Sequence, residues 1–270
     1  MSTVNKVVII TGASGGIGAA LADVFAAEKF KIVIASRNVQ KTETVRKKLE
    51  MHGHDVLSVI CDVSREEDCK KLIEQTVNRF GKIDVLINNA GISMRALFSD
   101  VEIDVIRKVM AVNFWGTVYC TKYALPYLLK SKGSLVGISS IAGKKGLPGR
   151  TGYSASKFAM EGFLETIRTE NLKKDLHVLV ACPGFTATDI RKNALSEKGI
   201  PQTSSPRAEE KMMTPERVAM LIYKAIVKRK RDLVLTGNGK ITVWLNKFFP
   251  SLMDKIVYNH MAKENDSPFK

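Results

Sequence analysis

The chain has 270 residues, of which 45% are hydrophobic, and carries a formal net charge of +15. Its length and apolar content suit one α/β domain with a continuous core, and apart from a polar tail after Met261 they exclude a disordered chain. The charge favours anionic partners such as phosphorylated cofactors, nucleic acid or acidic lipid headgroups, or it serves solubility alone.

Short β-branched runs alternate with longer helical patterns along the chain. The expected strands are Lys6–Ile10, Lys31–Ala35, Asp55–Cys61, Ile83–Ile87, Ser134–Ile138, His177–Ala181 and Asp232–Leu235. The expected helices are Ile17–Glu28, Gln40–His52, Arg65–Phe80, Asp104–Lys130, Tyr153–Leu172 and Pro215–Arg229. Continuously apolar strands are typical of a parallel sheet covered by helices on both faces. The sequence therefore predicts a doubly wound α/β sheet of the Rossmann type, which binds ligands beyond the carboxyl ends of its strands.

A glycine-rich segment, Thr11–Gly18, joins the first expected strand to the first expected helix. Gly12 would permit a tight turn, Gly16 would let the backbone approach a pyrophosphate, and Gly18 would let the helix pack close to the strand. The phosphates would then lie at the positive end of that helix. At this junction the pattern favours dinucleotide binding over a merely structural turn.

The second expected strand ends in Ala35, Ser36, Arg37 and Asn38, with no acidic residue. A site that selects NAD places an acid about 20 residues after the glycine motif to hold the ribose hydroxyls. Ser36 and Arg37 can bind a 2′-phosphate instead, so the sequence predicts NADP(H). The alternative is that Arg37 is an ordinary solvated arginine.

A tyrosine and a lysine lie four residues apart in Tyr153–Lys157, downstream of Ser139 and Ser140. On a helix this spacing places Lys157 beside Tyr153. A phenol with a pKa of about 10 transfers protons near neutral pH only when its anion is stabilised, which an adjacent ammonium can do.

These motifs together resemble the short-chain dehydrogenase/reductase superfamily over nearly all of Lys6 to Leu235. The resemblance rests on Thr11–Gly18, Asp62-Val63, Asn88-Asn89-Ala90-Gly91, Asn113, a serine 13 residues before Tyr153, the YxxxK pair, Pro183-Gly184 and Thr188. It implies an oxidoreductase that passes a hydride directly between a nicotinamide and a substrate carbon, without a metal.

The resemblance also implies the catalytic roles. Tyr153 would give its proton to the carbonyl oxygen during reduction or take it during oxidation. Ser140, rather than Ser139 on spacing, would polarise that oxygen. Lys157 would lower the pKa of Tyr153 and bind the nicotinamide ribose, and Asn113 would hold a water that links Lys157 to solvent.

The implied cofactor contacts follow from the same resemblance. Asp62 and Val63 should contact the adenine, Asn89 should lie near the adenosine side, and Thr188 should lie near the nicotinamide carboxamide. The full expected set is Gly12, Ser14, Gly16, Ile17, Gly18, Ser36, Arg37, Asn38, Asp62, Val63, Asn89, Ala90, Gly91, Tyr153, Lys157, Pro183, Gly184, Thr186 and Thr188.

Residues 185–215 are expected to cover the substrate, because Lys198–Arg207 is rich in turn-forming residues. The segment offers Ile190, Leu195, Ile200, Met212 and Met213 as apolar lining, although methionines serve equally often as core packing. We expect residues 1–237 to form the NADP(H)-binding catalytic domain.

Residues 238–270 form an expected amphipathic extension. Apolar residues from Ile241 to Val257 recur at helical spacing among lysines, and Pro250 should end one helix and permit another. Three roles fit: the segment lies on a membrane surface, packs on a partner subunit, or closes the substrate pocket. The cluster Lys228–Arg231 favours the membrane, and with it a lipophilic ketone of the acyl-chain or sterol type.

Other function classes fit less well. Four scattered cysteines without a CxxC pair predict reduced thiols in a cytoplasmic protein, and His52 and His54 lack a third ligand nearby, so no metal is expected. No motif supports nucleic-acid binding. A catalytically weak NADP(H)-binding regulator, and an epimerase or dehydratase of the same superfamily, remain alternatives. The resemblance to the superfamily also implies a homodimer or homotetramer built through Asp104–Lys130 and Tyr153–Leu172.

Overall fold

Parallel strands form the centre of the fold. The computed structural model describes residues 5–205, 212–264 and 267–269. In this part of the chain the strands are β1 (Val7–Thr11), β2 (Lys31–Ser36), β3 (Val56–Ile60), β4 (Val85–Asn88), β5 (Ser134–Ile138), β6 (His177–Cys182) and β7 (Asp232–Val234). They pair in the order β3-β2-β1-β4-β5-β6-β7, every pair parallel. The prediction of a doubly wound parallel sheet is confirmed.

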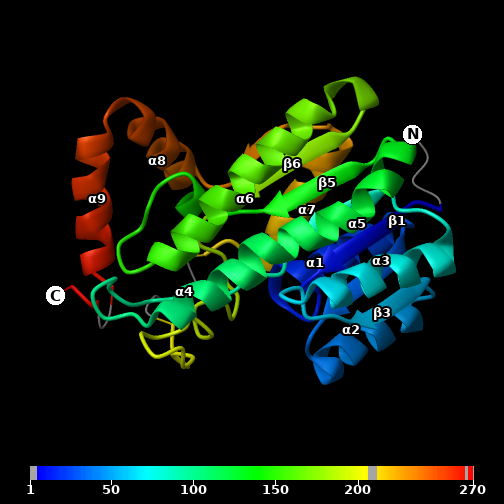
Figure 1. Ribbon diagram of the computed structural model, residues 1–270, viewed down its shortest axis with the longest axis horizontal. Coiled ribbons are helices and arrows are strands. Elements are labelled where there is room, and N and C mark those ends of the chain that lie inside the picture. Colours follow the sequence, from blue (N-terminus) through cyan, green and yellow to red (C-terminus); the bar gives the residue numbers. More distant parts are fainter. Residues whose placement is uncertain (1–4, 206–211, 265–266, 270) are drawn as a thin grey trace.

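Helices cover both faces of this sheet (Figure 1). They are α1 (Gly16–Ala27), α2 (Val39–Met51), α3 (Glu66–Phe80), α4 (Ile103–Met110), α5 (Gly116–Lys130), α6 (Thr151–Glu170), α7 (Pro215–Val227), α8 (Gly237–Phe248) and α9 (Pro250–Ala262). Residues of α1, α2 and α7 pack on one face, and residues of α3, α5 and α6 pack on the other. Strand residues alternate between these two cores, as in Val8 and Ile9, so the strands are apolar throughout.

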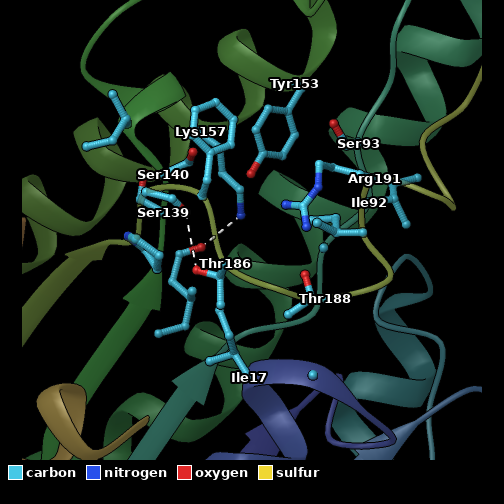
Figure 2. A pocket seen from close by; sticks show the side chains of 18 of the residues that line it. Ile17, Ile92, Ser93, Ser139, Ser140, Tyr153, Lys157, Thr186, Thr188 and Arg191 are labelled. Carbon is cyan, nitrogen blue, oxygen red and sulfur yellow. Dashed lines mark hydrogen bonds between the residues drawn. The ribbon is translucent and has the colours of Figure 1, made fainter. Parts of the chain in front are cut away.

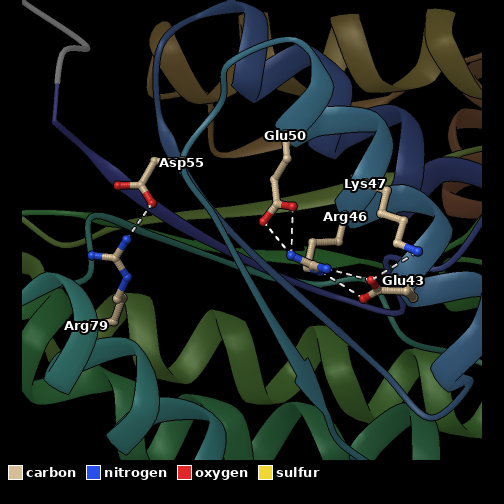
Figure 3. Close-up of polar contacts among 6 residues, drawn as sticks. All are labelled: Glu43, Arg46, Lys47, Glu50, Asp55 and Arg79. Carbon is tan, nitrogen blue, oxygen red and sulfur yellow. Dashed lines mark hydrogen bonds and ion pairs between the residues drawn. The ribbon is translucent and has the colours of Figure 1, made fainter.

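The outer face of α2 is polar. Arg46 pairs with Glu43 at 2.5 Å and with Glu50 at 2.6 Å, and Arg79 of α3 reaches Asp55 at 3.1 Å (Figure 3). The two pairs of Arg46, which have helical spacing, support α2 by a few tenths of a kcal/mol each. They keep this end of the molecule solvated, far from α8 and α9 (Figure 1).

One expected helix is interrupted. The pattern predicted a single helix over Asp104–Lys130, but α4 and α5 are joined by a π-helical turn at Ala111–Trp115, and residues 97–102 precede α4 in irregular structure. The amide of Gly116 donates to the carbonyl of Ala111, five residues back. Such turns accommodate one extra residue and often occur at functional sites. This one contains Asn113.

The C-terminal helices pack on the loop that precedes α6. Pro250 lies at the start of α9, directly after α8 ends, as predicted. Met253, Val257 and Met261 form a small apolar core with Leu147, Leu245 and Phe269. Asn246 Nδ2 donates to the carbonyl of Lys144 at 3.1 Å, and Lys145 pairs with Asp254.

A buried carboxylate holds the end of this segment. Glu264, 5% exposed, lies 3.4 Å from Nε of Arg95 and 3.6 Å from Nη2 of Arg150, both measured to its Oε2. Arg150 also donates to the carbonyl of Met94 at 2.9 Å and immediately precedes α6. The tail is therefore tied to the first turn of the helix that carries Tyr153.

Within the described ranges, none of the helices combines the length and apolar character needed to cross a bilayer. Part of the expected substrate-covering segment, residues 206–211 including Arg207, lies outside the described residues.

We expect Glu264→Gln to lower the free energy of unfolding by about 3 kcal/mol, because it leaves two buried guanidinium groups without this carboxylate. Asp254→Asn removes an ion pair of the same helical segment whose carboxylate is exposed, and should cost less than about 1 kcal/mol. Urea unfolding of both variants measures the difference. Equal losses would contradict the anchoring role of Glu264.

Candidate active site

A large cavity opens at the carboxyl edge of the sheet. It measures about 2130 Å³ and is lined by the glycine loop, the ends of β2, β4 and β5, the segment after β6, and α8 and α9. Typical small-molecule pockets measure about 300–1,000 Å³, so this one has room for a dinucleotide and a second ligand side by side.

The glycine loop leaves no room for side chains at two of its positions. Gly12 has φ +65°, and a Cβ there would lie 2.8 Å from Cα of Ala90. A Cβ on Gly18 would lie 2.3 Å from the carbonyl oxygen of Gly12. Gly15, which caps α1, offers no side-chain acceptor to the first amides of the helix. These amides and the helix dipole make a site suited to a phosphate group.

Asn89, the residue after β4, stabilises the glycine loop through hydrogen bonds. Its Nδ2 donates to the carbonyl of Thr11 at 2.9 Å and to that of Gly12 at 3.2 Å. The Thr11 hydroxyl in turn accepts from the amides of Asn89 and Ala90, both at 3.0 Å. The side chain of Asn89 thus fixes the turn on which the first helix depends, in addition to lining the cavity.

Polar and basic side chains gather where β2 ends. The Ser36 hydroxyl donates to that of Ser14 at 2.8 Å, and Arg37 lies 3.7 Å from Asp62 with 60% of its side chain exposed. Lys41, in the first turn of α2, also lines the cavity and was missed by the sequence analysis. The sequence feature that could have identified Lys41 is its position four residues after Arg37, at the start of the expected second helix.

The two adjacent serines have different environments. Ser139 is buried, and its hydroxyl donates to Oε1 of Glu161 at 2.5 Å. Ser140 has extended backbone, and its hydroxyl accepts from the amide of Ala142 at 3.2 Å while keeping its own proton to donate. Figure 2 shows Ser140 beside Tyr153 at one end of the cavity.

Burial is the main influence on Tyr153. It raises the pKa of the phenol, while hydrogen bonding by Ser140 and the nearby charge of Arg150 act in the opposite direction. Nζ of Lys157 lies 5.8 Å from the centre of the tyrosine ring. The lowering of the Tyr153 pKa expected from Lys157 stays a prediction, and the raised pKa keeps the phenol protonated near neutral pH.

Lys157 is buried and bonded to the backbone. Its ammonium donates to the carbonyl of Ile138 at 2.8 Å, and burial lowers its pKa to about 8. A Cβ on Gly91 would lie 3.4 Å from Nζ of Lys157 and 3.3 Å from Oδ1 of Asn113, so all three residues meet at one place.

Asn113 is fully buried in the π-helical turn. Its Oδ1 accepts from the amide of Ile92 at 2.8 Å, and its Nδ2 donates to the carbonyl of Ile92 at 2.9 Å and to Ser156 Oγ at 2.9 Å. These bonds join the loop after β4 to α6. The predicted water-holding role of Asn113 is not tested by this geometry.

Most of the residues expected from the sequence line the cavity. They are Gly12, Ser14, Gly16, Ile17, Ser36, Arg37, Asp62, Val63, Asn89, Ala90, Gly91, Ser140, Tyr153, Lys157, Pro183, Gly184, Thr186 and Thr188. Three do not: Gly18 lies beneath the glycine loop, Asn38 caps α2 by accepting from the amide of Lys41, and Asn113 is buried beside Lys157.

Two buried arginines, Arg150 and Arg191, also line the cavity. Figure 2 shows the guanidinium of Arg191 directed toward the space between Tyr153 and Thr188. Its Nε donates to Ser205 Oγ at 3.3 Å. Neither arginine could be identified from the sequence, because isolated arginines in loops are ordinarily solvated.

The apolar part of the cavity comes from the segment after β6 and from α8 and α9. Ile190, Leu195, Met212 and Met213 line it as expected, but Ile200 was predicted wrongly: it is 63% exposed and faces solvent. The C-terminal helices contribute Ile241, Leu245, Met253, Ile256, Val257 and Met261. The extension therefore forms a wall of the pocket.

All four cysteines are buried free thiols. In the described part of the chain, no three histidine, cysteine or acidic side chains gather in a group that could hold a metal ion.

Solved structures share this fold. A short chain dehydrogenase/reductase from Burkholderia phymatum in complex with NAD superposes with a TM-score of 0.84 at 24% identity, over 93% of this chain and 96% of that one. An alcohol dehydrogenase from Thermococcus sibiricus complexed with 5-hydroxy-NADP gives a TM-score of 0.75 at 24% identity, over 85% and 95% of the two chains.

Sequence relatives are closer. The chain is 35% identical over 269 residues to Dehydrogenase/reductase SDR family member 7B of Mus musculus, covering 97% of this chain and 83% of the relative. It is 34% identical over 256 residues to 11-beta-hydroxysteroid dehydrogenase A of Sesamum indicum, covering 92% and 73%. The short chain dehydrogenase family profile matches residues 6–199. The chain therefore belongs to the short-chain dehydrogenase/reductase family of oxidoreductases.

Proposed function

We propose that the protein is an NADP(H)-dependent oxidoreductase that interconverts a ketone or aldehyde with an alcohol. The observation that carries this proposal is the placement of Ser140, Tyr153 and Lys157 at one end of a cavity whose other part contains a glycine loop at a helix start. This juxtaposes a proton-transfer group with a site for a dinucleotide.

Each side chain has a distinct task in this proposal. When bound, the nicotinamide supplies or accepts the hydride. Ser140 donates a hydrogen bond to the substrate oxygen, and Tyr153 gives that oxygen a proton in reduction or removes it in oxidation. The raised pKa of Tyr153 favours the protonated form that reduction needs. Lys157 holds the nicotinamide ribose, and Asn113 holds a water that connects Lys157 to solvent.

The choice of NADP(H) is argued from the end of β2. Ser14, Ser36, Arg37 and Lys41 line the cavity there and can receive a 2′-phosphate. Asp62, which lies 3.7 Å from Arg37, is on the loop after β3 rather than at the end of β2. Arginine suits this contact, because its planar fork forms charge-assisted bonds with phosphate oxygens.

We propose a lipophilic substrate of the acyl-chain or sterol type. The apolar lining from the segment after β6 and from α8 and α9 supports it. A relative named as an 11-beta-hydroxysteroid dehydrogenase, at 34% identity, is consistent with it.

Exposed apolar side chains gather on α8 and α9 and at Phe249 between them. They are Ile241, Trp244, Phe248, Phe249, Leu252, Ile256 and Tyr258, of which Ile241 and Ile256 also line the cavity. Lys240, Lys247 and Lys255 are exposed on the same helices. Because aromatic and aliphatic side chains interleaved with lysines bind anionic bilayer surfaces, we propose peripheral membrane association at the cavity wall.

Other aspects of the protein also stay proposals. A homodimer or homotetramer is supported by two half-exposed aromatic residues. Trp115 immediately precedes α5 and Phe158 lies on α6, and these are the helices expected to form subunit contacts. A cytoplasmic location is expected from the free thiols. A regulatory NADP(H)-binding protein, or an epimerase or dehydratase, would use the same cavity without net reduction of a carbonyl.

Tyr153→Phe should lower the rate of carbonyl reduction by at least about 100-fold, because it removes the proton donor and leaves the ring. The Kd for NADPH, measured by fluorescence titration, should change by less than about twofold. Retained turnover would refute the assignment of Tyr153 as the proton donor. A loss of NADPH binding would show that the substitution damages the structure of the site.

Arg37→Gln should raise the Kd for NADPH about tenfold, which corresponds to the loss of about 1.4 kcal/mol from one charge-assisted phosphate contact. The Kd for NADH should stay unchanged. Arg65→Gln, at an exposed arginine outside the cavity lining, is the matched control. Equal effects on the two cofactors would argue for NAD(H).

NADPH oxidation should accelerate along a series of ketones of increasing chain length, and anionic liposomes should raise the rate further. The double variant Trp244→Gln/Phe248→Gln should lose the stimulation by lipid, whereas Leu172→Gln, at an exposed leucine outside α8 and α9, should keep it. Activity confined to small polar carbonyls and indifferent to lipid would contradict both the substrate class and the membrane role.

A further inference from the structure

Glu161 is a buried carboxylate that the proposed mechanism leaves without a task. It lies on α6 one turn beyond Lys157, is 9% exposed, and does not line the cavity. A buried carboxylate is costly unless it is paired and hydrogen-bonded, so its partners show what its burial achieves.

The partners of Glu161 flank Ser140. On one side, the Ser139 hydroxyl donates to Oε1 at 2.5 Å; on the other, Nζ of Lys144 lies 2.5 Å from Oε2. Cys182 Sγ donates to Oε1 at 3.5 Å from β6. One carboxylate therefore binds both ends of the segment Ser139–Lys144, which we call the serine turn.

The serine turn packs closely against the carboxylate of Glu161. A Cβ on Gly143 would lie 2.4 Å from Oε1 of Glu161 and 2.5 Å from Oγ of Ser139. Within the turn, the amide of Gly143 donates to the carbonyl of Ser140 at 2.9 Å. The amide of Ser139 donates to the carbonyl of Ala181 at 2.7 Å. The turn is thus fixed to β6 by its backbone and to α6 by Glu161.

We propose that Glu161 is a positioning residue: by holding Ser139 and Lys144 it fixes the serine turn so that the Ser140 hydroxyl faces Tyr153. The consequence for catalysis rests on the proposed function. Ser139 acts as the link between Glu161 and the turn, not as a second group that polarises the substrate. Because Glu161 and Tyr153 lie on the same helix, the carboxylate sets the position of one reacting side chain relative to the other.

The charge of Glu161 matters as well as its shape. A glutamine at this position can still accept from Ser139, but its amide cannot form an ion pair with Lys144. Glu161→Gln should therefore release one end of the turn, and Glu161→Leu should release both. Ser139→Ala removes the other attachment without altering charge.

The test compares these variants with Glu165→Gln. Glu165 lies one turn further along α6, where it pairs with Arg231 at 2.5 Å and has 61% of its side chain exposed. We expect kcat for carbonyl reduction to fall about 10-fold in Glu161→Gln and Ser139→Ala and about 100-fold in Glu161→Leu, because displacements near 1 Å can cost that much. The Kd for NADPH should change by less than about twofold in each, and Glu165→Gln should match wild type.

A second measurement does not depend on a substrate. Hydrogen exchange of the amides of the serine turn, in the presence of NADPH, should be faster in Glu161→Gln than in wild type or Glu165→Gln. If wild type reduces no carbonyl while exchange behaves as expected, the proposed function fails and the positioning of the turn stands.

Unchanged kcat and unchanged exchange in Glu161→Gln would overturn the proposal. So would a lower melting temperature with kcat intact, because that result assigns Glu161 to stability alone. If the Glu161 variants do not fold, Ser139→Ala and Lys144→Met provide the same comparison. In that case, the proposal would be overturned if Ser139→Ala and Lys144→Met both kept the kcat and the exchange rates of the wild-type protein.

Discussion

In the described part of the chain, the strands of the sheet all run in the same direction, and the loops that follow them therefore emerge at one edge. The order of strands reverses between β1 and β4, so the loop after β1 and the loop after β4 diverge to opposite faces and leave a space between them. At this switch point in the strand order, Nδ2 of the Asn89 side chain, which follows β4, donates to the carbonyls of Thr11 and Gly12, which lie at the start of the glycine loop. The cavity, the glycine loop and the start of α1 all depend on that arrangement.

Charged groups are buried around this edge, and each is held by specific partners. Lys157 donates to a backbone carbonyl, Glu161 binds Ser139 and Lys144, and Glu264 lies between two arginines. Burial raises the pKa of Tyr153 and lowers that of Lys157 to about 8. Both shifts favour the neutral forms, so the protein supplies a proton donor by excluding water as much as by placing charges nearby.

The sequence predicted the sheet because strands buried on both faces are apolar without interruption. Most of the site residues that it named do line the cavity, because the glycine loop, the asparagine motif and the tyrosine–lysine pair occur at strand ends in chain order. It missed Arg150, Arg191 and Glu161, since their roles depend on side-chain contacts between segments that are apart in the sequence. Ile200 was misplaced because an apolar residue in a loop carries no periodicity that fixes its direction.

The π-helical turn at Ala111–Trp115 also escaped the sequence pattern, because an inserted residue changes the phase of a helix without changing its apolar content. That phase change separates two surfaces. Lys108 and Ala111 line the cavity, whereas Cys120, Ala124 and Leu128 pack in the core against the sheet. One residue corresponds to a rotation of about 100°. Deleting a residue from the turn would leave each helix locally intact yet set the two out of phase, so that the same side chains could no longer face ligand and core together.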